Sequence, residues 1–82
     1  MGNSPLQITV RLFSYFRESV KKPDGTLQMA LPQGSHVKDI FRYIRLKHNE
    51  ISLVMINHNR ADMDDILQDG DFVEVFPIVG GG

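Results

Sequence analysis

Only one segment of this chain has the spacing of an amphipathic helix, and the other regular segments have the spacing of β-strands. After a Pro-Gln-Gly break at residues 32–34, Ser35 is placed to cap a helix by accepting backbone N–H bonds. The apolar residues that follow at intervals of three and four are Val37, Ile40, Phe41 and Ile44. This spacing places them on one helical face, and we expect the helix to end near residues 47–49. A single helix needs a partner for that face, so we expect a sheet to cover it.

Two β-strands are predicted before the helix. Residues 7–13 alternate apolar and polar side chains, and residues 26–31 do so again. The connection between them closes with Pro-Asp-Gly at residues 23–25, a sequence that suits a tight turn. We therefore expect the first two strands to pair as a hairpin.

Three more strands are predicted after the helix, at residues 53–56, 60–63 and 72–76. The first is apolar throughout and is typical of a buried strand, and an Asn-rich turn joins it to the second. In the third, Val73 and Val75 share one face.

The order of these elements predicts an α+β fold of the ubiquitin-like β-grasp kind. A mixed sheet of four to five strands would pack against one main helix, which buries the apolar face of each. We expect a single domain over residues 1–82, with a loose leader at 1–6 and a flexible Gly-rich C-terminal tail at 77–82.

Composition excludes several classes of protein. Cysteine is absent, so the chain has no disulfide framework and no thiolate site. No stretch reaches the roughly 20 apolar residues of a membrane span, and no secretory signal is present. We expect a soluble, cytoplasmic protein that does not contact the membrane. Charge is uneven along the chain: residues 1–48 hold eight Lys/Arg and three Asp/Glu, whereas residues 49–82 hold one and seven.

Histidine and acidic residues do not form a recognisable metal site. The spacing of His36, His48 and His58 does not match metal-ligand patterns. We expect His48 to be a partly buried residue at the end of the helix and His58 an exposed turn residue. Five aspartates lie between residues 62 and 71, but Val73 stands where a calcium loop of the EF-hand type needs a Glu. This segment is expected to be a solvated acidic loop, with no metal and no cofactor bound.

A basic stripe on the predicted helix does not indicate nucleic-acid binding. Lys38, Arg42 and Arg45 lie beside its apolar face, but no aromatic residues interleave with them and the net charge is −1. We expect a solvated helix face, or a rim that meets an acidic protein partner.

The chain ends in three glycines after its last predicted strand. A frayed end or residues left from cloning would explain them. Functionally, a tail without side chains can enter a narrow channel and present its carboxylate inside the active site of another protein. ATP converts such a carboxylate to an acyl-adenylate, which a sulfur or nitrogen nucleophile can attack.

The C-terminal segment, residues 69–82, resembles that of the MoaD/ThiS family of ubiquitin-like sulfur carrier proteins. It is most similar to MoaD, the small subunits of molybdopterin synthase, in which Asp-Gly-Asp leads into a strand and then Phe-Pro-Pro-Val-x-Gly-Gly. Here Ile78 replaces the second Pro, and Gly80 replaces the usual small residue. Arg17-Glu18 and Asn57 also fit the family pattern, and the resemblance covers residues 7–82.

The resemblance implies a carrier that is not an enzyme by itself. A ubiquitin-activating-enzyme-like adenylyltransferase would activate Gly82 with ATP, and a sulfurtransferase system would convert the adenylate to a thiocarboxylate. The tail would then enter the large catalytic subunit of molybdopterin synthase and donate its sulfur.

Roles for individual residues follow from this resemblance and from strand alternation. Gly82 would carry the sulfur. The residues expected to bind partners are Phe72, Phe76, Pro77, Ile78, Val79, Gly80 and Gly81. If Val73 and Val75 face the helix, Phe72 and Phe76 face outward and can form an apolar docking patch. In the alternative, Phe76 packs against its neighbours at the edge of the sheet.

Other functions fit the same pattern. The chain could carry sulfur for thiamine, a tungsten cofactor or another pathway, or it could be a ubiquitin-like modifier joined to lysines. From a different class, it could be a plain β-grasp interaction module whose glycines are inert. Fold alone does not separate these functions.

Overall fold

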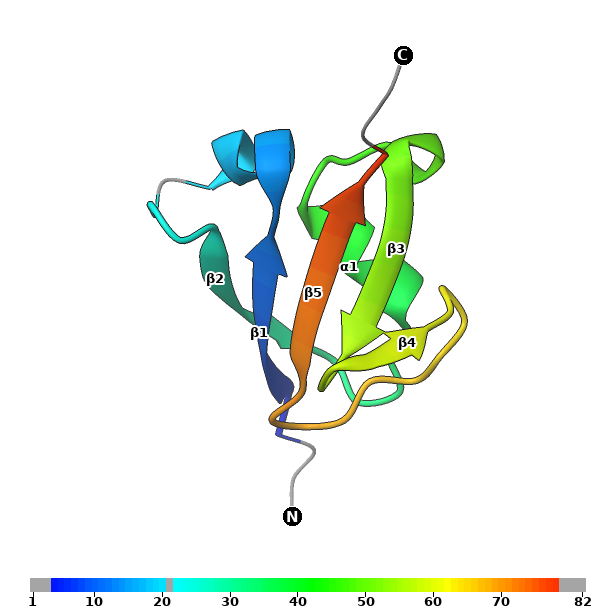
Figure 1. Cartoon of the computed structure of the whole chain (residues 1–82). Helices are drawn as coiled ribbons and strands as arrows, with labels where there is room; N and C mark the ends of the chain where they lie inside the picture. Colours follow the sequence, from blue (N-terminus) through cyan, green and yellow to red (C-terminus); the bar gives the residue numbers. More distant parts are fainter. Residues whose placement is uncertain (1–3, 21, 79–82) are drawn as a thin grey trace.

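The described residues form five strands and one α-helix, arranged as Figure 1 shows. The computed structural model describes residues 4–20 and 22–78. The elements are β1 (Leu6–Leu12), the 3₁₀ helix η1 (Ser14–Ser19), β2 (Thr26–Leu31), α1 (Val37–Tyr43), the 3₁₀ helix η2 (His48–Glu50), β3 (Ile51–Ile56), β4 (Asn59–Ala61) and β5 (Phe72–Pro77). The predicted class, a ubiquitin-like α+β fold with a mixed sheet and one main helix, is confirmed.

The last strand of the chain lies in the middle of the sheet, whose order is β2-β1-β5-β3-β4. β1 pairs antiparallel with β2, as predicted, and parallel with β5, where Val10 is opposite Val73. On its other side β5 pairs antiparallel with β3, and Val54 is opposite Val75. The C-terminal segment therefore leaves the fold from a central strand, next to β1 and β3.

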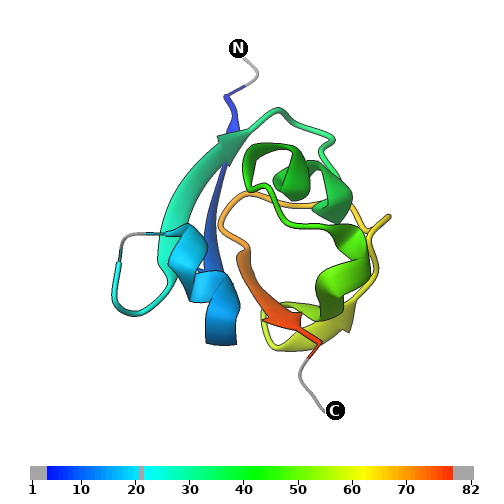
Figure 2. The ribbon, with the colours of Figure 1, turned by 90° about the horizontal axis from the view of Figure 1, so that it is seen from above.

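The helix covers one face of the sheet. Seen from above, the sheet curves around α1 (Figure 2). Val73 and Val75, which share one face as predicted, are fully buried on this side together with Val10 and Leu12 of β1. The other buried apolar residues are Leu6, Ile8, Phe16, Met29, Leu31, Val37, Ile40, Phe41, Ile44, Val54 and Leu67. No helix in residues 4–20 and 22–78 is long and apolar enough to cross a membrane.

The start of α1 differs from the prediction. His36, not Ser35, is the residue that precedes the first helical turn. Its backbone N–H donates to Asp39 Oδ2 at 2.8 Å, which satisfies a donor that the helix cannot satisfy itself. The Ser35 hydroxyl instead donates to the carbonyl of Pro32 at 2.7 Å.

The helix is also shorter than predicted. It ends at Tyr43, because Ile44 has extended backbone angles although its side chain stays buried. His48 was expected to be partly buried at the end of this helix. It lies instead in η2, where it is exposed, with its ring 5.6 Å from that of Phe41.

The boundaries of the leader and tail also shift. Leu6, expected in the leader, begins β1 and is buried. Pro77, expected to begin the tail, is the buried last residue of β5. Residues 1–3 and 79–82 lie outside the described part of the chain.

A tight turn joins β3 to β4 and connects to the start of β5. Asn57 and His58 have φ values of 50° and 70°, which match a two-residue hairpin turn with positive φ at both positions. The Asn57 side chain donates to Asp71 Oδ1 at 3.0 Å and accepts from the backbone N–H of Phe72 at 3.0 Å. One Asn thereby fixes where β5 begins.

Candidate functional site

One face of the sheet is not covered by α1. In Figure 1 the helix lies behind the sheet, so the view is onto this uncovered face. Because side chains alternate along a strand, Phe72, Glu74 and Phe76 of β5 point to the side opposite Val73 and Val75. The predicted outward orientation of Phe72 and Phe76 agrees with this arrangement.

Phe76 is part of a stack that crosses from β5 to the end of β1. Its ring centroid lies 4.3 Å from that of Phe13, and the two rings are nearly parallel, at 15°. The guanidinium carbon of Arg11 lies 4.8 Å from the Phe13 centroid, within cation–π range. The predicted alternative is therefore right in that Phe76 packs against a neighbour, but wrong in placing it at an edge, because β5 is central.

Two residues of β3 extend the apolar surface. Leu53 is opposite Phe76 and Met55 is opposite Glu74, and directly paired residues share a face. We define the open face as Phe13, Leu53, Met55, Phe72, Glu74 and Phe76. Its apolar members are all half-buried. An apolar surface of this kind, which α1 does not cover, is typical of a protein interaction site.

A carboxylate lies within this apolar surface. Glu74 is only 8% exposed, between Met55 of β3 and Arg11 of β1, which are its register partners. His58 Nδ1 lies 3.5 Å from Glu74 Oε1, and the His58 ring is 5.9 Å from that of Phe72. A partner that covers the open face must meet this carboxylate.

The backbone just beyond β5 is held by two other segments. The Ile78 N–H donates to the carbonyl of Glu50 at 2.9 Å, one residue beyond the end of β5. The Tyr15 hydroxyl donates to the Ile78 carbonyl over 3.4 Å. A Pro at position 78, as in the family ending that the sequence resembles, has no N–H for the first of these bonds.

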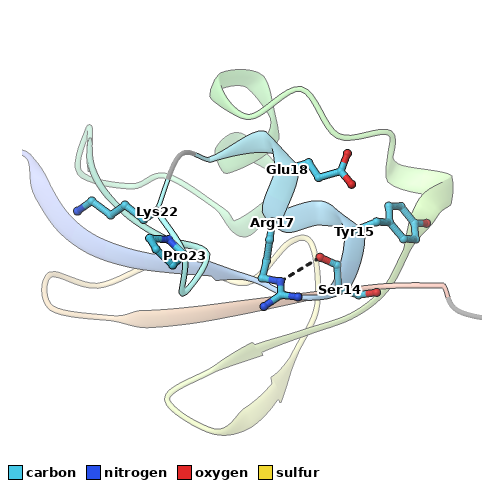
Figure 3. A pocket seen from close by; sticks show the side chains of 6 residues that line it. All are labelled: Ser14, Tyr15, Arg17, Glu18, Lys22 and Pro23. Atoms are coloured by element: carbon cyan, nitrogen blue, oxygen red, sulfur yellow. Dashed lines mark hydrogen bonds between the residues drawn. The ribbon is translucent and has the colours of Figure 1, made fainter.

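A hollow lies beside η1, lined by Ser14, Tyr15, Arg17, Glu18, Lys22 and Pro23 (Figure 3). Arg17 Nε donates to the Ser14 carbonyl at 3.3 Å. Gly25 has φ of 76°, and a Cβ there would lie 2.8 Å from Arg17 Cγ and would also meet the Leu12 carbonyl. Arg17, which fits the family pattern, thus packs against the turn at Gly25.

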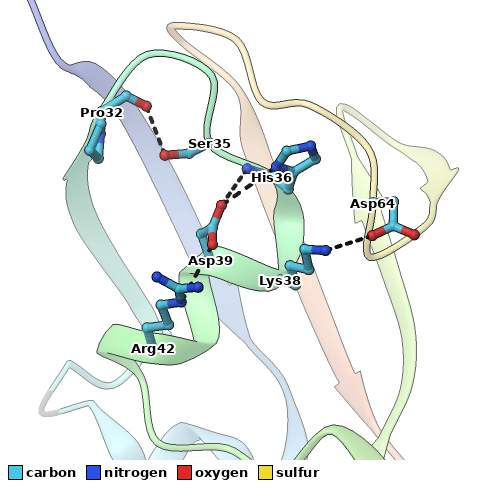
Figure 4. Close-up of polar contacts among 7 residues, drawn as sticks. All are labelled: Pro32, Ser35, His36, Lys38, Asp39, Arg42 and Asp64. Carbon is cyan, nitrogen blue, oxygen red and sulfur yellow. Dashed lines mark hydrogen bonds and ion pairs between the residues drawn. The ribbon is translucent and has the colours of Figure 1, made fainter.

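Two residues of the predicted basic stripe, Lys38 and Arg42, lie on α1 and pair with carboxylates of the chain (Figure 4). Lys38 Nζ lies 3.0 Å from Asp64 Oδ1, and this hydrogen bond lowers the pKa of Asp64. Arg42 Nε lies 3.6 Å from Asp39, whose pKa is lowered first by the His36 backbone N–H and then by the Arg42 charge. Arg45, the third predicted member of the stripe, is exposed beyond the end of α1, so the helix carries two of the three predicted residues.

The acidic loop uses its carboxylates to hold backbone turns. Asp65 accepts from the N–H of Asp62 at 2.9 Å, and Asp71 accepts from that of Gln68 at 2.8 Å. Asp69 accepts from the N–H of Gln7 in β1 at 2.8 Å. In the described part of the chain, no group of three or more His, Asp or Glu residues is placed to hold a metal ion.

The structure brings only some of the predicted site residues together. Phe72 and Phe76 lie on the open face, Pro77 is buried at the end of β5, and Ile78 is exposed beyond it. The predictions for Val79, Gly80, Gly81 and Gly82 fall outside the described residues.

Sequence reasoning missed four residues of this region: Phe13, Tyr15, Leu53 and Met55. Residues 53–56 are apolar throughout, so alternation gives no sign of which two face outward. Pairing β3 with β5, which fixes Val54 on the covered side, supplies that information.

The sequence matches the model of the ThiS family over residues 10–82. Among solved structures, a protein described as molybdopterin converting factor subunit 1 from Pyrococcus furiosus is 25% identical, with a TM-score of 0.72 over 90% of this chain and 99% of that one.

Two further structures share the fold at lower identity. Small archaeal modifier protein 1 from Haloferax volcanii is 17% identical, with a TM-score of 0.74 over 90% of this chain and 99% of that one. Subunit 1 in a complex of molybdopterin-converting factor subunits 1 and 2 from Helicobacter pylori is similar too. That match is 18% identical, with a TM-score of 0.61 over 94% of this chain and 100% of the other.

Proposed function

The chain belongs to the ThiS family, and from that premise we propose that it carries sulfur as a thiocarboxylate on Gly82 for molybdopterin synthesis. It is a small ubiquitin-like carrier rather than a catalytic subunit. One observation carries the proposal: the family match continues past β5 to residue 82 and so includes all three terminal glycines. We expect the cycle to run in the cytoplasm, where thiols stay reduced.

The chemistry requires a terminal carboxylate and two partner enzymes. In an ATP-dependent adenylyltransferase, a carboxylate oxygen of Gly82 attacks the α-phosphorus of ATP and displaces pyrophosphate. A sulfide equivalent from a sulfurtransferase system then attacks the carbonyl carbon of the acyl-adenylate and displaces AMP, leaving a thiocarboxylate. The chain itself supplies the reacting carboxylate and the surface by which each partner recognises it.

The open face supports this proposal because it lies at the base of the reacting tail. Phe72 and Phe76 would bind the partner's surface while the residues after β5 enter its active site. Ile78 and Val79 would contact the mouth of the channel, and Gly80 and Gly81 would pass through it. Glycine lacks a side chain, so it fits a channel too narrow for other residues.

The molybdopterin pathway is favoured by two similarities. The Pyrococcus furiosus protein described as molybdopterin converting factor subunit 1 is similar along nearly its whole length. The Helicobacter pylori subunit 1 shares the fold and was solved together with its subunit 2. The Helicobacter pylori complex supports a large catalytic subunit as the partner that accepts the sulfur.

The direct test is the intact mass of the chain after incubation with ATP, its adenylyltransferase and a sulfide source. We expect a mass increase equal to the replacement of one oxygen by sulfur. A chain lacking Gly82 is the control and should not change, because its last carboxylate is one residue short of the reacting position.

Other outcomes identify the alternatives. A chain joined to a lysine of another protein, with no thiocarboxylate, would indicate a modifier. No change with an active adenylyltransferase would contradict the proposal and favour an inert interaction module. The thiocarboxylate could also form without being consumed by the large subunit of molybdopterin synthase. That result would show that the chain carries sulfur, but for another pathway.

A further inference from the structure

The backbone of Ile78 is contacted on both sides by segments far from it in sequence. Its N–H donates to the carbonyl of Glu50, which ends η2, at 2.9 Å. Its carbonyl accepts from the hydroxyl of Tyr15, in η1, at 3.4 Å. Ile78 is the last residue that the structure describes. The two contacts therefore hold the point from which the C-terminal residues start.

Tyr15 is itself held in place by the fold. Its ring makes an edge contact with that of Phe16, at 5.1 Å between centroids, and Phe16 is buried in the core. Ser14, just before it, has φ of 57°, a backbone turn that directs the chain into η1 after Phe13. The hydroxyl thus reaches Ile78 from a ring anchored on the core.

The Tyr15 side chain is also exposed to solvent. The exposed large apolar side chains among the described residues are Tyr15, Tyr43, Ile66 and Ile78. Of these, Tyr15 and Ile78 meet at the base of the tail, beside the open face. Tyr15 is 48% exposed, and its hydroxyl donates to a backbone carbonyl. Core packing alone therefore does not explain a tyrosine at this position.

We propose that Tyr15 is a positioning residue that fixes the backbone of Ile78, so that the tail is presented to the adenylyltransferase from a defined starting point. This inference rests on the proposed function. A tail whose base is already ordered loses less conformational entropy when it enters the partner's active site. Tyr15 would act through Ile78, and the reacting carboxylate belongs to Gly82, four residues further along the chain.

Kinetics give the first prediction. Tyr15→Phe removes the hydroxyl and keeps the ring, so one partly exposed hydrogen bond is lost. We expect the KM of the adenylyltransferase for this variant to rise about two- to twelvefold, because such a bond is worth about 0.5–1.5 kcal/mol. The kcat should not change, since the loss affects binding rather than the chemical step. ATP–pyrophosphate exchange measures both constants.

NMR of the free protein gives a second readout that does not depend on any enzyme. In ¹⁵N-labelled protein, Tyr15→Phe should lower the heteronuclear NOE of the Ile78 amide and speed its hydrogen exchange. The amides of residues 72–76 should keep their wild-type values. Tyr43→Phe is the matched control, because it removes the hydroxyl of the only other tyrosine, on α1, and should alter neither readout.

The outcomes separate this inference from the proposed function. A Tyr15→Phe variant with wild-type KM overturns the positioning role, and so does an Ile78 amide that does not change. A lower kcat with an unchanged KM also contradicts it, because Tyr15 would then act on the chemical step. If the wild-type chain is not adenylated at all, the proposed function fails, and the presentation role fails with it, even where the NMR data still show the contact.

Discussion

The side chains on the two faces of β5 differ in how deeply they are buried, although both sets alternate along the same six-residue strand. Val73 and Val75 are fully buried against the layer that contains α1, whereas Phe72 and Phe76 remain half-buried on the open face. The smaller side chains thus fill the core, and the larger aromatic rings lie on the outside. The comparison teaches that the covered face accounts for stability and that the open face is available to a partner.

The largest expected effect is on the covered face. Leu12 is fully buried and pairs with Val75, so Leu12→Ala leaves a cavity in the core. We expect it to lower the free energy of unfolding by about 2–5 kcal/mol, measured by urea denaturation. The folded fraction should bind the adenylyltransferase with wild-type affinity. A loss of affinity beyond that explained by unfolding would contradict the assignment of stability to the covered face and of partner binding to the open face.

On the open face, a substitution should weaken partner binding more than it lowers stability. Phe76→Ala should weaken binding of the adenylyltransferase by about 2 kcal/mol, roughly thirtyfold, as an aromatic hot spot does. It should cost only about 1 kcal/mol in stability, since Phe76 is half-buried and its main loss is the stack on Phe13. Calorimetric titration and urea denaturation measure the two quantities.

Ile66→Ala is the control for this prediction, because Ile66 is exposed but lies outside the open face. It should change neither quantity by more than about 0.5 kcal/mol. Equal losses of binding and stability in Phe76→Ala would show that Phe76 is a packing residue only.

A smaller effect is expected from Arg11, which lies over the Phe13 ring. Arg11→Gln should reduce stability by about 0.5–1 kcal/mol through loss of the cation–π contact. In a double-mutant cycle with Phe76→Ala, the two losses should not add, because Phe13 links both residues. Arg45→Gln, on an exposed residue, is the control. If the two losses of stability add, Arg11 and Phe76 are not coupled through Phe13.

The smallest effect concerns the helix that covers the core. The pKa of Asp39 is lowered in the folded state, chiefly by the His36 backbone N–H. Its stabilising effect is therefore fully present above the unfolded pKa and is lost as the pH falls through the folded pKa. The stability difference between wild type and Asp39→Asn should shrink over that acidic range in urea titrations. A difference independent of pH would assign the effect of Asp39 to packing.

Much of the fold could be predicted because local patterns and tertiary structure agree. Residues 26–31 form β2 as predicted, and Val73 and Val75 face the core as alternation indicates. The end of the helix could not be predicted. Ile44 continues the helical spacing and is buried, but its backbone is extended, and periodicity reports burial rather than backbone angles.

The candidate site was less predictable than the fold. Phe72 and Phe76 follow from alternation within one strand. Leu53 and Met55 depend on the register of β3 against β5, and the Tyr15–Ile78 contact joins residues 63 positions apart. Contacts of this kind are set by topology and leave no local signal in the sequence.

The central claim is that a partner binds the open face, and methyl cross-saturation NMR with the adenylyltransferase tests it most directly. Leu53 and Met55 carry methyl groups on the open face, and Ile66 carries exposed methyl groups outside it. We predict that saturation of the partner's protons passes to Leu53 and Met55 and not to Ile66. Transfer to Ile66, with Leu53 and Met55 unaffected, would contradict the account.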